Sequence, residues 1–513
     1  MRRKKTKQTV EFGDFQTPLG LAREACRALA RSGVAPSSVV EPTCGTGNFL
    51  LAALDQFPDV RKVVGLDINQ CYVNAATHAV RSREDVGKVH ITCDDFFTVN
   101  WPQLLKDLPE PLLVVGNPPW VTNSTLGLLG SSNLPNKSNF QKHSGLDAMT
   151  GKSNFDISEW MLICLLEWLN GRDGTMAMLC KTSVARKVLA HAWKNDIYLE
   201  DARVHAIDAG HHFGAVVDAC LLICRTSSSV RSNDCVVYDS LSATKAEQIF
   251  GYRDGQLTAD VALYERWKHL QGNEGYKWRS GVKHDCAKVM ELRREETRYR
   301  NGLRELVELE DEYLFPMLKS SDLANGSNGG PMRLMLITQR AAGGDTSNIE
   351  HLAPRTWNYL LEHAEFLDRR ASSVYKNRSR FSIFGVGPYS FAPWKVAISG
   401  FYKKLAFKVV GNVDGKPIML DDTSYFVPCR TKDEAEYIAS LLNSQVAKTF
   451  FEAFIFWDTK RPITVELLNR IDLLALAREL GSEVTMASYL AQQRSSYKKR
   501  ARAHAEQGEL FPS

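Results

Sequence analysis

The chain has 513 residues, of which 44% are hydrophobic, and a formal net charge of +5. This length and composition predict about two to four globular domains with sizeable cores, and they exclude a disordered or fibrous protein. No run approaches the roughly 18 consecutive apolar residues of a membrane span, and no apolar segment follows the basic start, so we expect no signal peptide, no membrane contact and a cytoplasmic location.

Short apolar runs rich in β-branched residues recur along the first 230 residues, at 37–42, 62–68, 89–95, 112–120, 175–183, 201–209 and 218–225. Helical patterns such as NFLLAALDQF and DISEWMLICLLEWLNG lie between many of them. Strands that alternate with helices predict βαβ units and a mostly parallel, doubly wound α/β sheet of the Rossmann-like type. In such sheets ligands bind at the carboxyl ends of the strands.

The sequence pattern changes after residue 228, where SSSVRSNDC interrupts the alternation of strand-like and helical segments. Gly, Pro and aromatic residues then separate short β-like runs, which predicts a second domain of mixed α+β structure. We expect five segments: a basic N-terminal tail at 1–11, the α/β domain at 12–228, a connector at 229–280, the mixed domain at 281–475, and a basic helix and tail at 476–513.

A glycine-rich turn, VVEPTCGTGNFL, follows the first predicted strand. It lacks the GxGxxG pattern of dinucleotide sites and the lysine of a P-loop, so a pyrophosphate ligand is not indicated. Glu41 precedes this turn, and Asp67 ends the next strand at the spacing where a carboxylate binds ribose hydroxyls. S-Adenosylmethionine, with a sulfonium, an ammonium and a ribose, suits this acidic pair. The alternative is that both acids only cap helices.

The fourth strand runs into Asn117-Pro118-Pro119-Trp120. The exocyclic amine of adenine is a poor nucleophile, because its lone pair is delocalised into the ring. The amide oxygen of Asn117 and the carbonyl of Pro118 can accept its two N–H groups and localise that pair toward a methyl donor. The prolines fix these acceptors, and Trp120 offers a flat face to an extruded base. The alternative is a rigid loop with a packed tryptophan.

Together these motifs resemble the gamma-type, TaqI-like DNA adenine-N(6) methyltransferases of type II restriction-modification systems. NPPW matches the catalytic motif of that family in full, and the resemblance spans about residues 12–475. It implies a class I S-adenosylmethionine-dependent methyltransferase domain, followed by a target-recognition domain that binds double-stranded DNA. The cofactor residues that it implies are Thr17 of DFQTP, Glu41, Thr43, Cys44, Gly45, Gly47, Asp67, Ile68, Asp95 and Phe96 of CDDFF, with Asp94 as an alternative, and Asn117.

The resemblance also leaves choices open. HHFGAVVDACLLI resembles the hairpin that carries a second aromatic against the extruded base, here Phe213, although a core phenylalanine is nearly as compatible. The NPPW tetrapeptide does not exclude the N(4) amine of cytosine, an RNA or protein amine, or an inactive DNA-binding module. A cytosine carbon-5 enzyme is disfavoured, because the Pro428-Cys429 pair lies far from the fourth strand.

Basic residues next to aromatic residues and glycines are the candidates for DNA contact. They are Arg369, Arg370, Lys376, Arg378, Arg380, Lys403, Lys404, Lys460 and Arg461. The alternative is a solvated charged surface. About a dozen residues precede the cofactor domain, so we expect methylation without cleavage, and any cognate restriction endonuclease would be a separate protein.

Metal chemistry is not indicated by the sequence. The eleven cysteines form no CxxC pair, which favours structural thiols over disulfides or zinc. His211 and His212 are adjacent, and at strand spacing they would face opposite ways. We therefore expect no metal requirement. We also expect a monomer, since each domain is large enough for its own core.

Overall fold

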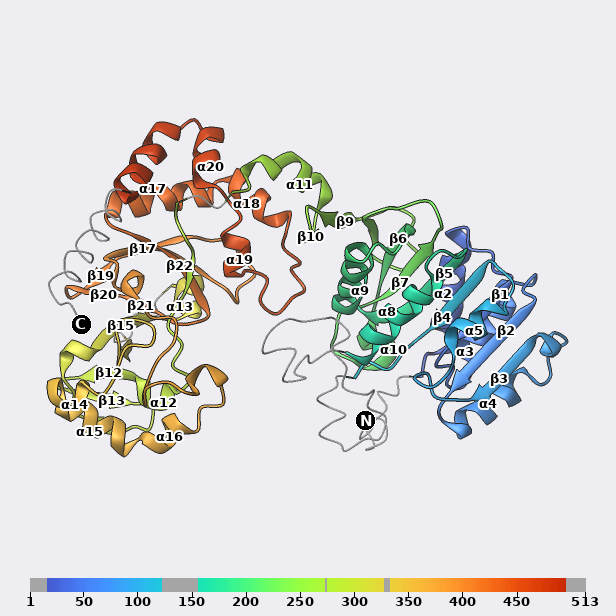
Figure 1. Cartoon of the computed structure of the whole chain (residues 1–513), viewed down its shortest axis with the longest axis horizontal. Helices are drawn as coiled ribbons and strands as arrows, with labels where there is room; N and C mark the ends of the chain where they lie inside the picture. Colours follow the sequence, from blue (N-terminus) through green and yellow to red (C-terminus); the bar gives the residue numbers. More distant parts are fainter. Residues whose placement is uncertain (1–15, 122–155, 273–274, 327–332, 495–513) are drawn as a thin grey trace, which may run out of the picture. The chain divides into compact units, whose positions relative to one another are not determined.

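The computed structural model describes residues 16–121, 156–272, 275–326 and 333–494. The chain divides into two compact units, Met1–Val261 and Ala262–Ser513 (Figure 1). Within the described ranges, no helix is long and apolar enough to cross a membrane. All eleven cysteines are free thiols.

Unit 1 is built on a ten-stranded sheet with the order β10-β9-β8-β6-β7-β5-β4-β1-β2-β3. Its described elements are α2 (Leu19–Arg31), β1 (Ser38–Glu41), α3 (Asn48–Gln56), β2 (Lys62–Asp67), α4 (Gln70–Val80), η1 (Val86–Lys88), β3 (Val89–Cys93), α5 (Trp101–Lys106), β4 (Leu112–Gly116), α8 (Ile157–Leu169), β5 (Gly174–Lys181), α9 (Thr182–Lys194), β6 (Leu199–Ile207), α10 (Ala209–Phe213), β7 (Ala219–Thr226), β8 (Asp234–Tyr238), β9 (Gln248–Arg253) and β10 (Gln256–Thr258).

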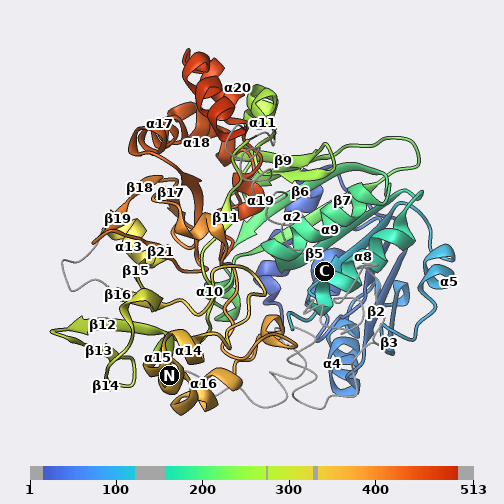
Figure 2. The same cartoon turned by 60° about the vertical axis from the view of Figure 1, so that its left-hand side comes forward.

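The strand order reverses direction between β1 and β4. β1 pairs in parallel with both β2 and β4, so that Val40 lies opposite Val64 on one side and Val114 on the other. β7 is antiparallel to both β5 and β6. Because crossovers are right-handed, this reversal places α3 and α4 on one face and α8 and α9 on the other; α8 and α9 lie side by side (Figure 2). The predicted doubly wound α/β fold is confirmed.

The central strands are buried on both faces. Every residue of β1 and β4 is buried, which explains why these strands read as continuous apolar runs and not as alternating ones. On one face Val39, Leu113 and Val115 share a core with α2 and α3. A side chain at Gly65 of β2 would lie 2.7 Å from Leu50 Cδ1, so this glycine lets α3 pack closely on the sheet.

The segment that follows β7 differs from the expected connector at 229–280. Residues 234–258 form β8, β9 and β10, which extend the first sheet, with β8 parallel to β6. Later aromatic residues of the same segment, Tyr264, Trp267 and Trp278, are buried in a core of unit 2. The sequence change at 228 therefore reflects strands of mixed pairing toward one edge of the sheet, whose pattern differs from that of the buried parallel strands, and not a linker.

Unit 2 has the expected mixed α+β character, with sheets of four strands (β11-β22-β17-β18), six strands (β14-β13-β12-β16-β15-β21) and two strands (β19-β20) among its described residues. Its elements, beginning with a helix that crosses the boundary, are α11 (Val261–Trp267), η2 (Lys268–Leu270), β11 (Arg279–Ser280), α12 (Ala287–Met290), β12 (Glu291–Glu295), β13 (Arg298–Asn301), β14 (Leu306–Val307), η3 (Asp311–Tyr313), β15 (Leu314–Leu318), α13 (Ser320–Asn325), β16 (Arg333–Leu336), α14 (Ile349–Leu352), α15 (Pro354–Glu362), α16 (Ala364–Asp368), η4 (Ser373–Tyr375), η5 (Pro388–Phe391), β17 (Trp394–Ser399), β18 (Lys408–Val410), β19 (Asn412–Val413), β20 (Lys416–Pro417), β21 (Met419–Leu420), β22 (Ser424–Cys429), α17 (Lys432–Asn443), α18 (Gln445–Glu452), α19 (Val465–Leu468) and α20 (Leu473–Glu479).

Two large hydrophobic clusters stabilise unit 2. One joins β17 and β22 to α17, α18 and α20, and the other lies around β12, β15 and β16. Met486 and Leu490 are buried in the first cluster, although the sequence places them in the C-terminal helix and tail at 476–513. The described part of that segment therefore belongs to the folded unit. The tail at 1–11 lies outside the described residues.

Candidate active site

Three neighbouring strands of unit 1 end in the polar residues that the sequence singles out. β1 ends at Glu41, β2 ends at Asp67, and Asn117 directly follows β4. These strands are adjacent and parallel, so their carboxyl ends meet at one edge of the sheet. The edge is also the point where the strand order reverses, which is where open α/β sheets bind ligands.

The glycine-rich turn is tied to the end of β2. The Cys44 amide donates to Leu66 O (2.7 Å), and the Gly45 amide donates to Asp67 Oδ2 (2.8 Å). Gly45 and Gly47 have φ of 50° and 83°, in the left-handed region that glycine adopts without strain. A side chain at Gly47 would also lie 3.0 Å from Ala76 Cβ. Both glycines are therefore required by the turn itself.

Glu41 is a buried acid, with 3% of its surface exposed. Its Oε2 accepts a hydrogen bond from the Leu50 amide (3.2 Å) in α3. Burial raises the pKa of the Glu41 carboxyl well above its usual value, and Asp67 raises it further, whereas the Leu50 amide lowers it. A carboxylate under such a desolvation cost is stabilised by a bound cation.

Asp67 holds the turn with one oxygen and the start of α4 with the other. Its Oδ1 accepts from the Asn69 amide (2.8 Å), and its Oδ2 accepts from Gly45. Both oxygens of Asp67 therefore fix backbone amides beside the end of β2. Ile68, the next residue, is 46% exposed and presents an apolar surface beside this carboxylate.

The segment DFQTP lies against the glycine-rich turn from its described residue Gln16 onward. Asn48 Nδ2 donates to the carbonyl of Thr17 (2.8 Å), and the Thr46 amide donates to Gln16 Oε1 (3.1 Å). Thr17 itself is buried. Thr43 Oγ1 donates to the carbonyl of Asn117 (3.4 Å) and so links this turn to the loop after β4. Gln16 is a contact that the sequence motifs did not single out.

The side chains of the CDDFF segment differ in their exposure to solvent. Asp94 is exposed, and Asp95 Oδ1 accepts from the Phe97 amide (2.9 Å). Phe96 is 6% exposed, and its ring packs against Phe97, Trp101 and Trp168 with centroids 5.1 to 5.9 Å apart. The structure therefore places the Phe96 ring in an aromatic cluster at the end of β3.

The loop after β4 brings two predicted aromatic residues together. Trp120 is 6% exposed, and its indole N–H donates to the carbonyl of Leu179 in β5 (3.3 Å). Its ring lies against Phe213 of α10, with centroids 5.2 Å apart and planes at 72°. These residues are far apart in the sequence, and both were expected to contact an extruded base. With their planes at 72°, they cannot both stack face to face on one base in this arrangement.

Lys181, at the end of β5, was not among the predicted site residues. Its ammonium lies 2.5 Å from Asp156 Oδ2 and 3.5 Å from the carbonyl of Trp120. Asp156 is buried and caps α8 through the Ser158 amide. The ion pair therefore joins the end of the NPPW loop to the start of α8. In the sequence, Asp156 is only an acid at an expected helix start, and Lys181 is only a lysine at a strand end. Their pairing can be inferred only when the positions of the strands are known.

His211 and His212 lie on α10 and not on a strand, with ring centroids 4.9 Å apart. The strand spacing that we expected for them was wrong, because a short helix joins β6 to β7. In the part of the chain that the structure describes, no group of three His, Cys, Asp or Glu side chains is placed to hold a metal ion.

Apart from Arg370, the basic candidates of unit 2 fall into three sets. Arg369 and Arg380 are exposed and form ion pairs with Glu365 and Asp368. Arg461 lies 4.5 Å above the ring of Phe401 and so stands next to the 401–404 segment. The remaining candidates with exposed side chains are Lys376, Arg378, Lys403, Lys404 and Lys460.

Arg370 differs from the other eight candidates. Its guanidinium donates to the carbonyls of Leu367 (2.8 Å), His284 (3.2 Å) and Ser382 (2.8 Å) and lies 3.8 Å from the ring centroid of Tyr375. Burial lowers its pKa, although it stays a cation. The structure therefore gives Arg370 the role of an internal brace, which the count of basic residues along the segment could not reveal.

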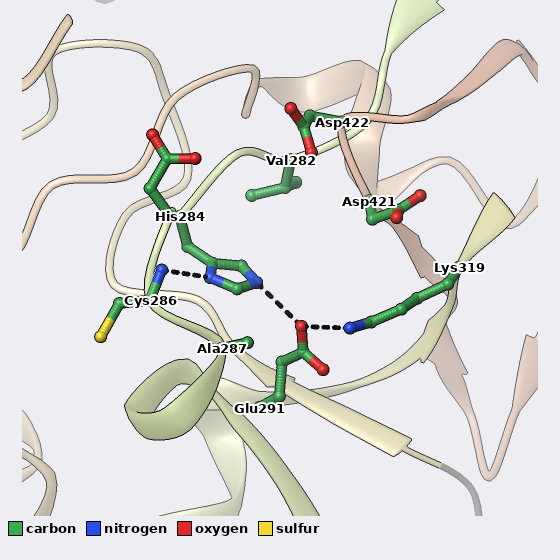
Figure 3. Close-up of a pocket in the computed structure, with 9 residues that line it drawn as sticks. Val282, His284, Cys286, Ala287, Glu291, Lys319, Asp421 and Asp422 are labelled. Carbon is green, nitrogen blue, oxygen red and sulfur yellow. Dashed lines mark hydrogen bonds and ion pairs between the residues drawn. The ribbon is translucent and has the colours of Figure 1, made fainter. Parts of the chain in front are cut away.

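Arg370 braces the wall of a pocket of about 300 Å³ in unit 2 (Figure 3). At its floor, the Glu291 carboxylate lies between His284 Nε2 (3.5 Å) and Lys319 Nζ (2.7 Å). These two partners hold the pKa of Glu291 below its usual value against the effect of burial. The Glu291 carboxylate is therefore paired within the pocket, whose lining also includes Asp421 and Asp422.

The strand order of unit 1 and the residues at its ligand edge define a class I S-adenosylmethionine-dependent methyltransferase. The model of the family described as N-6 DNA Methylase matches residues 1–261. Type II methyltransferase M.NspV from Nostoc sp. (strain ATCC 29411 / PCC 7524) is 45% identical over 473 residues, which cover 92% of this chain and 98% of the relative. The chain belongs to the N-6 DNA methylase family, and the predicted DNA N(6)-methyltransferase is confirmed.

Among solved structures, the chain is similar to the Type IIL restriction-modification enzyme MmeI in complex with DNA. The TM-score is 0.51 and the identity 14%, and the likeness covers 88% of this chain and 64% of that one. The chain thus spans less than two thirds of the length of MmeI, and at this identity the likeness concerns the fold alone. The family has S-adenosylmethionine as cofactor and DNA as substrate.

Proposed function

We propose that the chain is a site-specific enzyme that transfers a methyl group from S-adenosylmethionine to the N(6) amine of an extruded adenine in double-stranded DNA, and that this protects the DNA from a cognate restriction endonuclease. The observation that carries this proposal is the position of Asn117. It follows the strand next to β1, on the edge that also holds Glu41 and Asp67, and the Trp120 and Phe213 rings lie in the same region.

The ligand edge fits the cofactor in three respects. The buried Glu41 carboxylate suits a group of positive charge. Asp67 ends β2 at the position of a ribose-binding acid, and exposed Ile68 offers an apolar contact to an adenine ring. Thr17, Thr43, Cys44, Gly45 and Gly47 form or border the turn between them. Asp95 and Phe96, at the end of β3, complete the proposed cofactor set. Bound here, S-adenosylmethionine supplies an electrophilic methyl group.

The loop after β4 then acts on the amine. Asn117 Oδ1 and the Pro118 carbonyl accept the two N–H hydrogens of adenine, which localises the nitrogen lone pair toward the methyl group. Pro118 and Pro119 fix the backbone that carries these acceptors. The cofactor, held at the edge with Glu41 and Asp67, would supply the methyl group and keep the electron pair of the broken carbon–sulfur bond, and the methylated amine would lose one proton to solvent. Thr43 and Lys181 position the loop through the carbonyls of Asn117 and Trp120.

DNA recognition is assigned to unit 2. Its exposed candidates are Arg369, Lys376, Arg378, Arg380, Lys403, Lys404, Lys460 and Arg461, and Arg370 is left out because its donors are used within the protein. We accordingly assign catalysis to unit 1, Met1–Val261, and recognition to unit 2, Ala262–Ser513. The relative M.NspV is named a type II methyltransferase, which supports a separate restriction endonuclease as functional partner. A monomeric state and a cytoplasmic location complete the proposal.

The test is nucleoside mass spectrometry on methylation-free double-stranded DNA incubated with S-adenosylmethionine and the protein, beside an Asn117→Ala variant. We expect N(6)-methyladenine with the wild-type protein and at least about 100-fold less with the variant in the same incubation. N(4)-methylcytosine would retain the mechanism and overturn the choice of base. An unmodified DNA, with cofactor binding intact, would point instead to an RNA or protein amine or to an inactive DNA-binding module.

A further inference from the structure

The connection between β6 and β7 carries an apolar tip that the proposed mechanism does not use. Val216 is fully exposed, and its neighbour Val217 is 39% exposed. Water disfavours apolar surface, and single exposed valines are common on protein surfaces. The exposure of Val216 and Val217 alone therefore does not indicate a function, and their position in the fold must be considered.

Hydrogen bonds hold the tip on both sides. The Gly214 amide donates to Gly210 O (3.0 Å), and the Ala215 amide donates to Ala209 O (3.2 Å), which ends α10. On the other side, Asp218 O accepts from the Thr182 amide (3.0 Å), and β7 begins at Ala219. Val216 and Val217 are thus a two-residue projection between anchored backbone groups.

Two connections join this tip to the catalytic loop. Phe213, three residues before Val216, packs against the ring of Trp120. Ala219, two residues after Val217, lies opposite Lys181, whose ammonium contacts the carbonyl of Trp120. Figure 1 shows α10 at one end of the strands β6 and β7. The tip therefore stands at the edge of the sheet where the target base must enter.

The charges around the tip point to bases and not to phosphates. Residues 208–218 contain no lysine or arginine, and they include Asp208 and Asp218. Lysine and arginine make most side-chain contacts to phosphate, and this segment offers only His211 and His212 in their place. Proteins that deform the duplex instead insert apolar side chains between stacked bases.

We propose that Val216, supported by Val217, is a wedge that enters the duplex beside the target adenine and occupies the space that the extruded base leaves. The wedge positions the substrate, because it replaces part of the lost base stacking and favours the extruded state. Asn117 and the prolines act on the amine only afterwards. This inference rests on the proposed function, since it requires that the substrate base be extruded from double-stranded DNA.

The test compares Val216→Ser and Val216→Leu with a matched control, Val230→Ser. Val230 is also an exposed valine of unit 1 (49%), but it lies in the β7–β8 connection, at the opposite edge of the sheet. Each protein methylates two oligonucleotide duplexes that contain the site located by sequencing of methylated plasmid DNA. In one duplex the target adenine is paired with thymine, and in the other it faces an abasic position.

We expect Val216→Ser to lower kcat/KM on the paired duplex about tenfold and to leave the abasic duplex within about twofold, because a base without a partner is already easy to extrude. Val216→Leu and Val230→Ser should resemble the wild type on both, and cofactor affinity should not change. Equal activity of Val216→Ser and wild type on the paired duplex, or an equal loss on both duplexes, would overturn the wedge. A wild-type protein that methylates neither duplex would refute the proposed function itself.

Discussion

The two units place their polar residues in different ways. In unit 1, Glu41, Asp67 and Asn117 are fixed by the ends of three adjacent strands of one sheet. In the described part of unit 2, sheets of four, six and two strands are joined by loops, and the eight exposed basic candidates all lie outside helices and strands. Chemistry on one amine requires positions fixed to a fraction of an ångström, whereas loops can vary without disturbing a core. The comparison predicts that changes in the two units have separable effects.

The largest effect on ligand binding is expected at the cofactor edge. Glu41→Gln should weaken S-adenosylmethionine binding on the order of 100-fold, because a buried hydrogen bond or ion pair to a charged group contributes about 2–3 kcal/mol. Isothermal titration calorimetry measures the affinity for S-adenosylmethionine. Glu110→Gln serves as the control, since Glu110 is an exposed acid just before β4. DNA affinity should be unchanged. Equal cofactor affinity in both variants would remove Glu41 from the site.

The same variant has a pH signature. Because the pKa of Glu41 is raised in the folded state, the folded protein binds more protons than the unfolded chain between the two pKa values. The stability of the cofactor-free protein should therefore fall as the pH rises through that range. Glu41→Gln should flatten this dependence in thermal melts. A dependence that persists in the variant would assign it to another group.

A medium effect is expected at the brace of unit 2. Arg370→Ala leaves three carbonyl groups without their donor and should lower the free energy of unfolding by about 2 kcal/mol. Arg378→Ala, an exposed neighbour, should not change stability. Chemical denaturation separates the two. Wild-type stability of Arg370→Ala, with lost DNA binding, would return this residue to the DNA contacts.

The smallest effect is expected for exposed lysines. The double variant Lys403→Ala/Lys404→Ala should weaken DNA binding about tenfold and reduce the slope of log affinity against log salt by about 2, if each lysine meets one phosphate. Fluorescence anisotropy over a salt series measures both quantities. Lys432→Ala/Lys448→Ala, on the helices α17 and α18, serves as the control. Unequal losses across DNA sequences would instead indicate base contacts.

The sequence located the polar ends of three adjacent strands in unit 1, because each part of that pattern is local. The Glu41 turn, Asp67 and the NPPW tetrapeptide are contiguous motifs at the ends of apolar runs, and periodicity locates those runs. The contact of Trp120 with Phe213 was not predicted: the family resemblance related both residues to a target base, and 92 intervening residues separate them.

Features that depend on tertiary partners escaped prediction. β8 to β10 were expected in a connector because their partners, β6 and one another, are not marked in the local sequence. Lys181 gains its role only when β5 lies beside β4. Arg370 looks like its basic neighbours in the sequence, and only the carbonyls around it distinguish it. Periodicity in the sequence locates helices and strands, but the hydrogen-bond partners of a single polar side chain are known only from the folded structure.

The most direct test of the account is single-turnover methylation by Asn117→Ala at saturating DNA and S-adenosylmethionine, with the affinity for each measured in parallel. We expect the rate to fall about 10²- to 10³-fold, the range for loss of one group that stabilises a transition state, while both affinities stay near those of the wild type. A wild-type rate in this variant would contradict the role of the strand-end loop. A loss of cofactor affinity large enough to explain the lower rate would contradict it as well.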